Sequence, residues 1–268
     1  SKLGSSNWEK EKPLLDEISN LYEQHKAETD PEKKEIIYKK IDEVSQEASK
    51  FAIANEYDKA ISSLGASGTN AHTWLDETVY KNNIPNNELE KWLKIEKERF
   101  SELTLRLFHT ELEAVYEEKN RTLDNDGRQV FETLFSNLFQ KHNYGQQTTI
   151  GTVEHLKNPS LVEIRKYFNN YYVPNNMAVI FSGDFNPDEV IGKVDKAFSY
   201  MKFKEVPKYT FQPETPITAP IVKEVVGPDA ENLTIGFRLP GNKDKDVLLA
   251  DLVGQILTNG KAGLLDLN

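Results

Sequence analysis

Two charged segments at the start of the chain carry hydrophobic residues at helical spacing. One face of the first segment holds Leu14, Leu15, Ile18, Leu21 and Tyr22, and one face of the second holds Ile36, Ile37, Ile41 and Val44. Such spacing is typical of amphipathic helices. Between them, Asp30 is suited to cap a helix and Pro31 to enter its first turn. Residues 8–58 are therefore predicted to form an antiparallel helical pair, solvated and salt-bridged, without chemistry of its own.

The pattern then changes to that of a β-hairpin. The turn-forming cluster at residues 65–68 is followed by two short runs, 69–74 and 78–80, which are joined by Leu75-Asp76-Glu77. Short runs bounded by turn residues predict strands. We therefore expect two antiparallel strands here.

Helical and strand patterns are mixed along the rest of the chain. The predicted helices are one near residues 89–95 capped by Asn86 or Asn87, one that carries Glu111 and Glu118, and those at 130–139, 161–172 (capped by Ser160), 187–200 and 246–258. The predicted strands are 177–184, which is expected to be buried and to end in a glycine turn, 221–226 and 233–239. This order favours an α+β fold over a doubly wound sheet.

Composition and charge exclude several classes of protein. The chain has 268 residues and a net charge of −10, which argues against nonspecific nucleic-acid binding. No apolar run reaches the roughly 20 residues that span a bilayer, and the polar opening residues do not resemble a signal peptide. The absence of cysteine excludes disulfides and thiolate zinc sites, and it fits a cytoplasmic or a periplasmic protein equally well.

The most informative chemistry is a pair of glutamates. Glu111 and Glu118 are seven residues apart, so on a helix they share one face with Phe108 and Val115. Carboxylates beside an apolar stripe need a partner, and a metal ion or a buried cation would be suitable. The alternative is that both are solvated glutamates in a charge-rich segment.

Five short motifs follow one another along residues 65–184. They are Gly65-Ala66 with Asn70-Ala71-His72-Thr73, Thr78 and Tyr80; Leu89-Glu90 with Glu98-Arg99-Phe100; Glu111, Val115 and Glu118; Tyr144-Gly145 with Ile150-Gly151; and Tyr171-Tyr172-Val173-Pro174-Asn175-Asn176-Met177 with Gly183-Asp184. In this order they resemble the M16 family of zinc metallopeptidases, the pitrilysin and mitochondrial-processing-peptidase group. The resemblance implies an α+β fold with a mixed or antiparallel sheet flanked by helices.

The resemblance also implies an organisation into parts. Residues 1–60 are interpreted as a helical insertion, and 61–206 as the remainder of a first M16-like domain without its N-terminal strands. Residues 207–220 form a linker that carries four prolines, and 221–268 begin a second, truncated domain. Residues 2–8 resemble the sequence that follows the family's catalytic motif in long bacterial members, so we expect the chain to be a fragment of a bacterial protein.

The family's defining motif, His-x-x-Glu-His, is absent from this sequence. In the family, two histidines of that motif and a downstream glutamate hold Zn²⁺, and the ion activates a water molecule for peptide hydrolysis. The resemblance implies that Glu118 is this third ligand and that Glu111 orients the ligands. One carboxylate cannot hold zinc tightly, so zinc is expected in the full-length protein, whereas this chain alone is expected to bind no zinc and to have no activity.

The hairpin is the second candidate site. In the family an edge strand pairs with the extended backbone of the substrate, which implies a substrate-binding role for Asn70, Ala71, His72 and Thr73. The family more often has an aromatic residue at the position of His72. The alternative for His72 is therefore a half-exposed strand histidine.

Two functions from different classes remain after this reading. The first is part of an active zinc metallopeptidase, whose partners are a peptide or unfolded polypeptide substrate and further M16 domains or a partner subunit. The second is a noncatalytic M16-like subunit that binds peptides or acts as a scaffold. Intact Glu111 and Glu118 favour the first. A helical interaction module at residues 8–58 is compatible with both.

Overall fold

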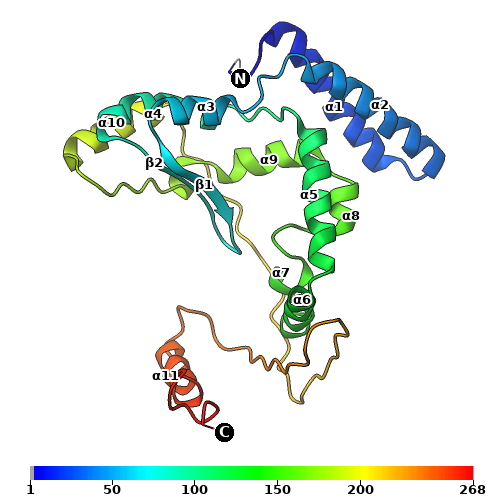
Figure 1. The fold of residues 1–268 in the computed structure, drawn as a ribbon, viewed down its shortest axis with the longest axis vertical. Coiled ribbons are helices and arrows are strands. Elements are labelled where there is room, and N and C mark those ends of the chain that lie inside the picture. The colour runs from blue at the N-terminus through cyan, green and yellow to red at the C-terminus, as the bar shows by residue number, and fades with distance from the viewer. Residues whose placement is uncertain (1–2, 268) are drawn as a thin grey trace. The chain divides into compact units, whose positions relative to one another are not determined.

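The computed structural model describes residues 3–267, which form helices and one antiparallel hairpin (Figure 1). In chain order the elements are α1 (Trp8–Ala27), α2 (Pro31–Ser49), α3 (Glu56–Ser63), β1 (Ser67–Thr73), β2 (Thr78–Asn83), α4 (Leu89–Ser101), α5 (Phe108–Leu123), α6 (Asp126–Leu138), α7 (Asn143–Gln146), α8 (Val153–Lys157), α9 (Leu161–Tyr171), α10 (Pro187–Phe198) and α11 (Val247–Leu257). Short 3-10 turns lie at Asn86–Glu88 and Pro174–Asn176. The chain divides into a first unit, residues 3–122 and 147–210, and a second unit, residues 123–146 and 211–267. The domain boundaries drawn from the sequence stay predictions.

The predicted helical pair is confirmed, and α1 and α2 lie side by side (Figure 1). The Asn7 side chain caps α1 by accepting from the Lys10 amide at 3.2 Å. Asp30 caps α2 as expected, accepting from the Glu32 amide at 3.0 Å, and Pro31 follows in the first turn. The side-chain oxygens thus satisfy backbone donors that have no partner inside the helices.

One hydrophobic cluster of the first unit joins this pair to elements far along the chain. The buried residues of this cluster are Leu15, Ile18, Tyr22, Ile41, Val44, Ala48 and Leu161. Leu161 comes from α9, while Phe108 and Leu112 of α5 pack against the same cluster. The apolar faces read from the sequence therefore meet, and the helical pair is packed against α5 and α9.

His25 lies in the same region and makes stability depend on pH. Its side chain is buried beside the Tyr38 ring, and burial, followed by the nearby Lys34 charge, lowers its pKa. Below the usual histidine pKa the unfolded chain binds a proton that the folded chain binds less readily, so stability is present above that pKa and falls with acidification. We expect urea unfolding to show a smaller loss of stability between about pH 7.5 and about pH 5 in His25→Gln than in wild type. The exposed His155→Gln serves as the control, and an unchanged pH dependence in His25→Gln would contradict the assignment.

The predicted hairpin is also confirmed. Strands β1 and β2 pair antiparallel, with Ala71 opposite Tyr80 and Thr73 opposite Thr78. The Trp74 amide donates to the Glu77 carbonyl at 2.9 Å and closes the turn. Every residue of β1 is exposed.

Three predicted strands are not strands in the structure. Residues 177–184, 221–226 and 233–239 have no ladder partner among residues 3–267, where the only pairing outside the hairpin is an isolated bridge between Ser5 and Ala52. Ile180 is 88% exposed, so the prediction of a buried strand at 177–184 is wrong as well. An apolar run shows that a segment is suited to a sheet, but a strand also needs a neighbour that accepts and donates its backbone hydrogen bonds.

The helix predictions hold apart from details at the ends. The Ser160 cap is confirmed, because its hydroxyl accepts from the Glu163 amide at 3.1 Å. Neither Asn86 nor Asn87 caps α4, since both lie in a 3-10 turn and α4 begins at Leu89 without a side-chain cap. The presence of both helices and an antiparallel hairpin confirms the α+β class.

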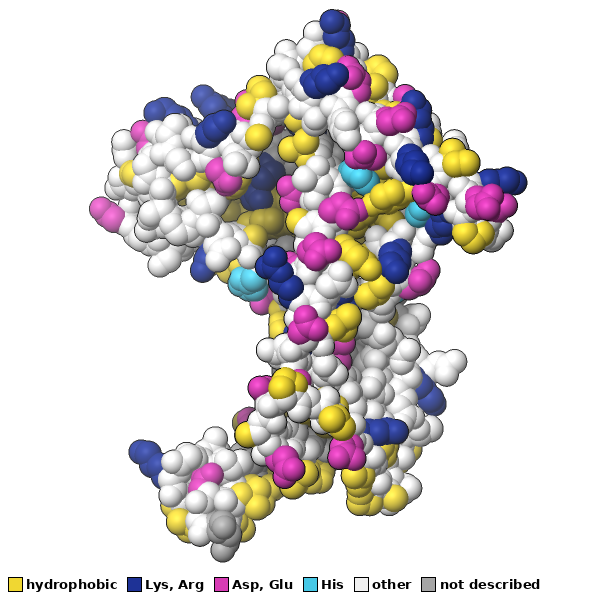
Figure 2. All heavy atoms as spheres, turned by 45° about the vertical axis from the view of Figure 1, so that its right-hand side comes forward, with side chains coloured by type: hydrophobic (Ala, Val, Ile, Leu, Met, Phe, Trp, Pro, Cys, Tyr) yellow, Lys and Arg dark blue, Asp and Glu magenta, His cyan; other side chains and the backbone are white. Residues whose placement is uncertain are grey.

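The second unit holds α6, α7 and α11 with long extended segments between them. Glu214 connects one of these segments to the loop between α6 and α7, accepting from the Lys141 and His142 amides at 2.7 Å each. Arg238 donates to the Leu138 carbonyl at 2.5 Å and lies 3.6 Å from the Glu214 carboxylate. Many apolar side chains of this unit stay at the surface (Figure 2), among them Leu233, Phe237, Leu248 and Leu252.

Within residues 3–267, no helix combines the length and the apolar character that a membrane span requires.

Candidate functional site

Helix α5 carries both candidate glutamates. It follows Leu107, whose φ of 53° turns the chain, and whose carbonyl accepts from the Glu111 amide at 3.0 Å. Glu111 and Glu118 share one face because seven residues are almost two helical turns. Both are exposed, whereas Phe108 and Val115 are half-buried. The row of four residues therefore lies at the solvent edge of the helix, so the expected cost of burying the carboxylates does not arise here.

The residues around these glutamates do not complete a metal site. Across the described part of the chain, no three His, Asp or Glu side chains lie close enough together to hold an ion. A zinc centre takes at least three protein ligands. Glu118 is thus at most one ligand of a larger set, and the residues present do not fit a bound zinc ion.

The hairpin presents an open strand edge. In an antiparallel pair, directly opposite residues alternate between hydrogen-bonded and non-hydrogen-bonded pairs. The Trp74–Glu77 bond places Thr73–Thr78 and Ala71–Tyr80 in the non-hydrogen-bonded class, and the two threonine hydroxyls lie 3.5 Å apart. The backbone groups of Ala71 and Thr73 therefore point away from β2, toward the open edge of β1.

Asn70 and His72, the other two candidate residues on β1, place their side chains beside this edge. The Ala71 amide donates to Asn70 Oδ1 at 2.9 Å, so the Asn70 side chain covers part of the edge. His72 is exposed, and its Nε2 lies 3.7 Å from Glu77 Oε1. His72 stands opposite Val79, on the face away from Ala71 and Tyr80. The structure thus brings Asn70–Thr73 together on one strand and Glu111 with Glu118 on one helix.

A group of polar and aromatic side chains supports the hairpin, and the sequence pattern did not indicate that these residues meet. We call it the platform: Tyr57 of α3, Glu96, Arg99 and Phe100 of α4, Tyr80 of β2, and Tyr172. Glu96 is 2% exposed and accepts from Tyr57 Oη at 2.8 Å and from Arg99 Nε at 3.0 Å. Burial raises the pKa of Tyr57 to about 12 and that of Tyr172 to about 12. The one feature of the sequence that indicated part of the platform is the spacing of Glu96 and Arg99, which lie one turn apart on a helix and can form an ion pair.

His109 is a second polar group that the sequence pattern did not single out. Its side chain is 11% exposed, and its Nδ1 lies 2.8 Å from Tyr22 Oη. Burial raises the pKa of Tyr22 and of Tyr38, whose hydroxyl donates to Glu113. The sequence pattern placed Tyr22 on the apolar face of its helix, and the hydroxyl of a buried tyrosine usually has a hydrogen-bond partner. A buried polar residue such as His109 could have been predicted from this.

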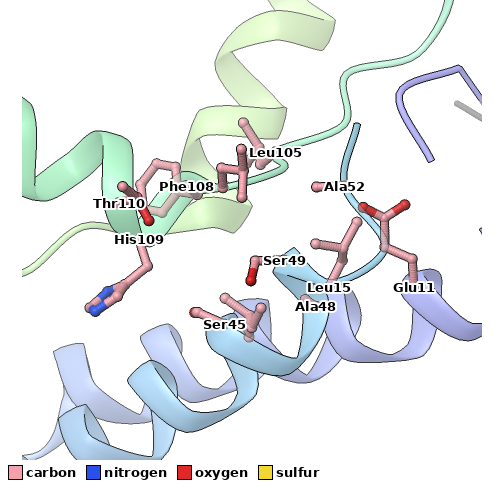
Figure 3. Close-up of a pocket in the computed structure, with 12 residues that line it drawn as sticks. Glu11, Leu15, Ser45, Ala48, Ser49, Ala52, Leu105, Phe108, His109 and Thr110 are labelled. Atoms are coloured by element: carbon pink, nitrogen blue, oxygen red, sulfur yellow. The ribbon is translucent and has the colours of Figure 1, made fainter. Parts of the chain in front are cut away.

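A cavity of about 20 Å³ lies between α1, α2 and the start of α5 (Figure 3). Its walls include Leu15, Ala48, Phe108 and Glu11, the last fully buried. Glu11 Oε1 accepts from Arg106 Nε at 2.7 Å, and Arg106 Nη1 also donates to the Leu3 carbonyl at 2.6 Å. The volume matches about one water molecule, so this cavity is too small for a substrate.

Comparisons with known proteins are consistent with the motifs read from the sequence. The family model "Insulinase (Peptidase family M16)" matches residues 41–152, and "Peptidase M16 inactive domain" matches residues 160–266. The chain is 29% identical over 219 residues to Zinc protease PqqE of Helicobacter pylori, which covers 79% of this chain and 49% of that protein. It is 24% identical to Mitochondrial-processing peptidase subunit beta of Dictyostelium discoideum over 159 residues, 59% of this chain and 33% of that one.

A solved structure agrees with this. The crystal structure of a protease from Helicobacter pylori matches with a TM-score of 0.54 and 28% identity, over 58% of this chain and 38% of that chain. The chain spans about half the length of the Helicobacter relative and a third of the Dictyostelium one.

Proposed function

Since the chain belongs to the M16 peptidase family, we propose that it works as part of a zinc-dependent metalloendopeptidase that hydrolyses peptide bonds. The observation that carries this proposal is the open edge of β1, on a chain whose relatives include a zinc protease. The substrate is a peptide or an unfolded polypeptide. Further M16 domains or a partner subunit complete the enzyme.

The edge of β1 suits an extended peptide chemically. A peptide that lies beside β1 exchanges hydrogen bonds with the outward amide and carbonyl groups of Ala71 and Thr73. Backbone pairing is independent of sequence, and it fits an enzyme that takes unfolded segments. The side chains of Asn70 and His72 lie beside this path and are the residues that distinguish one peptide from another.

We further propose that Glu118 is a metal ligand in the complete enzyme and that Glu111 orients the ligand set. Both carboxylates are exposed on one face of α5, so they are free of the core and accessible to groups from elsewhere. The residues described here do not hold zinc by themselves. The chain alone is therefore proposed to be inactive.

The second candidate function is a noncatalytic M16-like subunit that binds peptides or scaffolds an active partner. This function comes from the sequence as an alternative, and the match of residues 160–266 to a domain described as inactive does not favour it, because those residues do not include α5. It requires no metal ligand, so it assigns no role to Glu118. The two functions therefore differ in what Glu118 does.

The test replaces Glu118 by glutamine in the complete protein that carries this chain, with the neighbouring exposed Glu117→Gln as the control. Losing a direct ligand is expected to lower zinc affinity and peptide cleavage by more than the roughly 10–100-fold typical of residues behind the ligands, and Glu111→Gln should fall within that range. Zinc content is measured by atomic absorption and cleavage with a fluorogenic peptide. If Glu118→Gln changes neither, the ligand assignment is wrong and the noncatalytic function is favoured.

A further inference from the structure

We infer that Arg99 is a positioning residue for the peptide-pairing edge: its guanidinium, fixed by the buried Glu96, holds Tyr80 of β2 and so orders β1. The inference rests on the proposed function, because it assigns a purpose to the order of an edge that binds peptides. Arg99 does not touch the edge itself. It acts through Tyr80, which stands directly opposite Ala71.

Arg99 is held in place by the buried Glu96. Its Nε donates to Glu96 Oε2 at 3.0 Å, and the other oxygen of Glu96 accepts from Tyr57 Oη at 2.8 Å. The Glu96 side chain is 3% exposed, so its charge is stabilised by these two donors rather than by water. The guanidinium therefore has one well-defined plane and position.

The guanidinium of Arg99 lies against three aromatic rings. Its central carbon lies 4.4 Å from the ring centre of Tyr80, 4.4 Å from that of Phe100 and 5.0 Å from that of Tyr57. These distances are typical of cation–π contacts. Only Tyr80 of the three belongs to the hairpin, so the stack joins β2 to α3 and α4.

The hairpin depends on contacts with the platform for its order. A two-stranded hairpin is marginally stable alone in water, and every residue of β1 is exposed. The hairpin is held on the face that carries Tyr80 and Asn82, through Tyr80 Oη to Tyr172 Oη at 2.8 Å and Asn82 Nδ2 to Tyr57 Oη at 3.2 Å. Both bonds end on side chains of the platform. An ordered edge binds a peptide more tightly than a mobile one, because the strand does not lose its freedom on binding.

The experiment compares the full chain with its Arg99→Lys variant, which keeps the charge but loses the planar group that stacks on rings. The control is Arg128→Lys, since Arg128 also lies over an aromatic ring, that of Phe131, and pairs with a glutamate. The probe is a short fluorescein-labelled peptide rich in Val, Thr and Lys. Its affinity is measured by anisotropy, and exchange of the β1 amides by NMR with and without the peptide.

For Arg99→Lys we expect about tenfold weaker peptide binding and about tenfold faster exchange of the hairpin amides, with the unfolding midpoint of the whole chain unchanged. Arg128→Lys should change neither. If wild type protects the Ala71 and Thr73 amides on binding but Arg99→Lys binds equally well, the inference is wrong and the proposed function stands. If wild type shows no protection at β1, the proposed function fails and the inference falls with it.

A variant that unfolds would give no answer, so a second one is included. Tyr80→Leu removes the ring from β2 and leaves the Glu96–Arg99 pair intact. It is expected to reproduce the loss of peptide affinity and the faster exchange of the hairpin. Unchanged affinity in a folded Tyr80→Leu protein would also overturn the inference.

Discussion

Replacing Glu11 by alanine is expected to lower the free energy of unfolding by about 3–5 kcal/mol, because it removes the buried carboxylate that pairs with the largely buried charge of Arg106. Glu11 is fully buried, and the Arg106 side chain is 15% exposed. Arg106 also bonds to the Leu3 carbonyl and lies over the Trp8 ring at 5.4 Å. The pair thus links α1, the segment before α5 and the first described residues. The measurement is urea unfolding followed by circular dichroism.

The chain supplies a matched control for this prediction. Lys12 and Asp16 form an ion pair with the same 2.7 Å separation, but both side chains are more than half exposed. Asp16→Ala is therefore expected to change stability by less than about 1 kcal/mol. The double variant Glu11→Met with Arg106→Met removes both charges and should recover most of the loss. A loss in Glu11→Ala no larger than in Asp16→Ala would show that the buried pair does not stabilise the fold.

Replacing Tyr22 by alanine is expected to cost about 3–5 kcal/mol, the range for removing a large aromatic side chain from a packed core. Tyr22 is completely buried, and its ring meets that of Phe108 edge to face at 5.4 Å. Tyr22→Phe keeps the ring but removes the bond to His109 Nδ1, so it should cost only about 1–2 kcal/mol. Thermal and urea unfolding of both variants give the comparison.

The control for Tyr22 is Tyr167 on α9, which is 58% exposed. Tyr167→Ala is expected to stay within about 0.5 kcal/mol of wild type. Tyr22→Phe also tests the phenol. Burial raises its pKa, so the unfolded chain loses this proton first as pH rises, and stability decreases above about pH 10. The decrease should be smaller in Tyr22→Phe, and equal losses in Tyr22→Ala and Tyr167→Ala would contradict the packing described here.

Local signals in the sequence predicted the helices and the hairpin well. Asp30 with Pro31, and Ser160, mark helix starts through bonds within a few residues, so no knowledge of the rest of the fold was needed. The strand at 177–184 failed because a strand depends on a partner that its own sequence does not specify. The prediction of the hairpin is correct because its two strands are joined by a short turn, so each strand has its partner close by in the sequence.

For the candidate site as well, the sequence predicted the features that depend on local spacing and missed those that depend on tertiary packing. The spacing of Glu111 and Glu118 predicted their shared face, but it did not predict that both face solvent, since exposure depends on what packs against α5. The platform was missed because Tyr57, Arg99 and Tyr172 meet only after folding, from three separate elements. The motifs read from the sequence contain Tyr80, Arg99, Phe100 and Tyr172, but they do not indicate that these side chains meet.

The Asn70 side chain has a consequence for the protein before any peptide arrives. An open strand edge is a template on which other chains can pair and aggregate. Asn70 Oδ1 already occupies the Ala71 amide, so a second copy of the chain cannot dock there without first breaking an internal bond. A long peptide that forms several bonds along β1 can displace that contact, whereas a brief collision cannot. The Asn70 side chain thus protects the edge of β1 against pairing with other copies of the chain. The edge stays accessible to extended peptides that form several backbone hydrogen bonds.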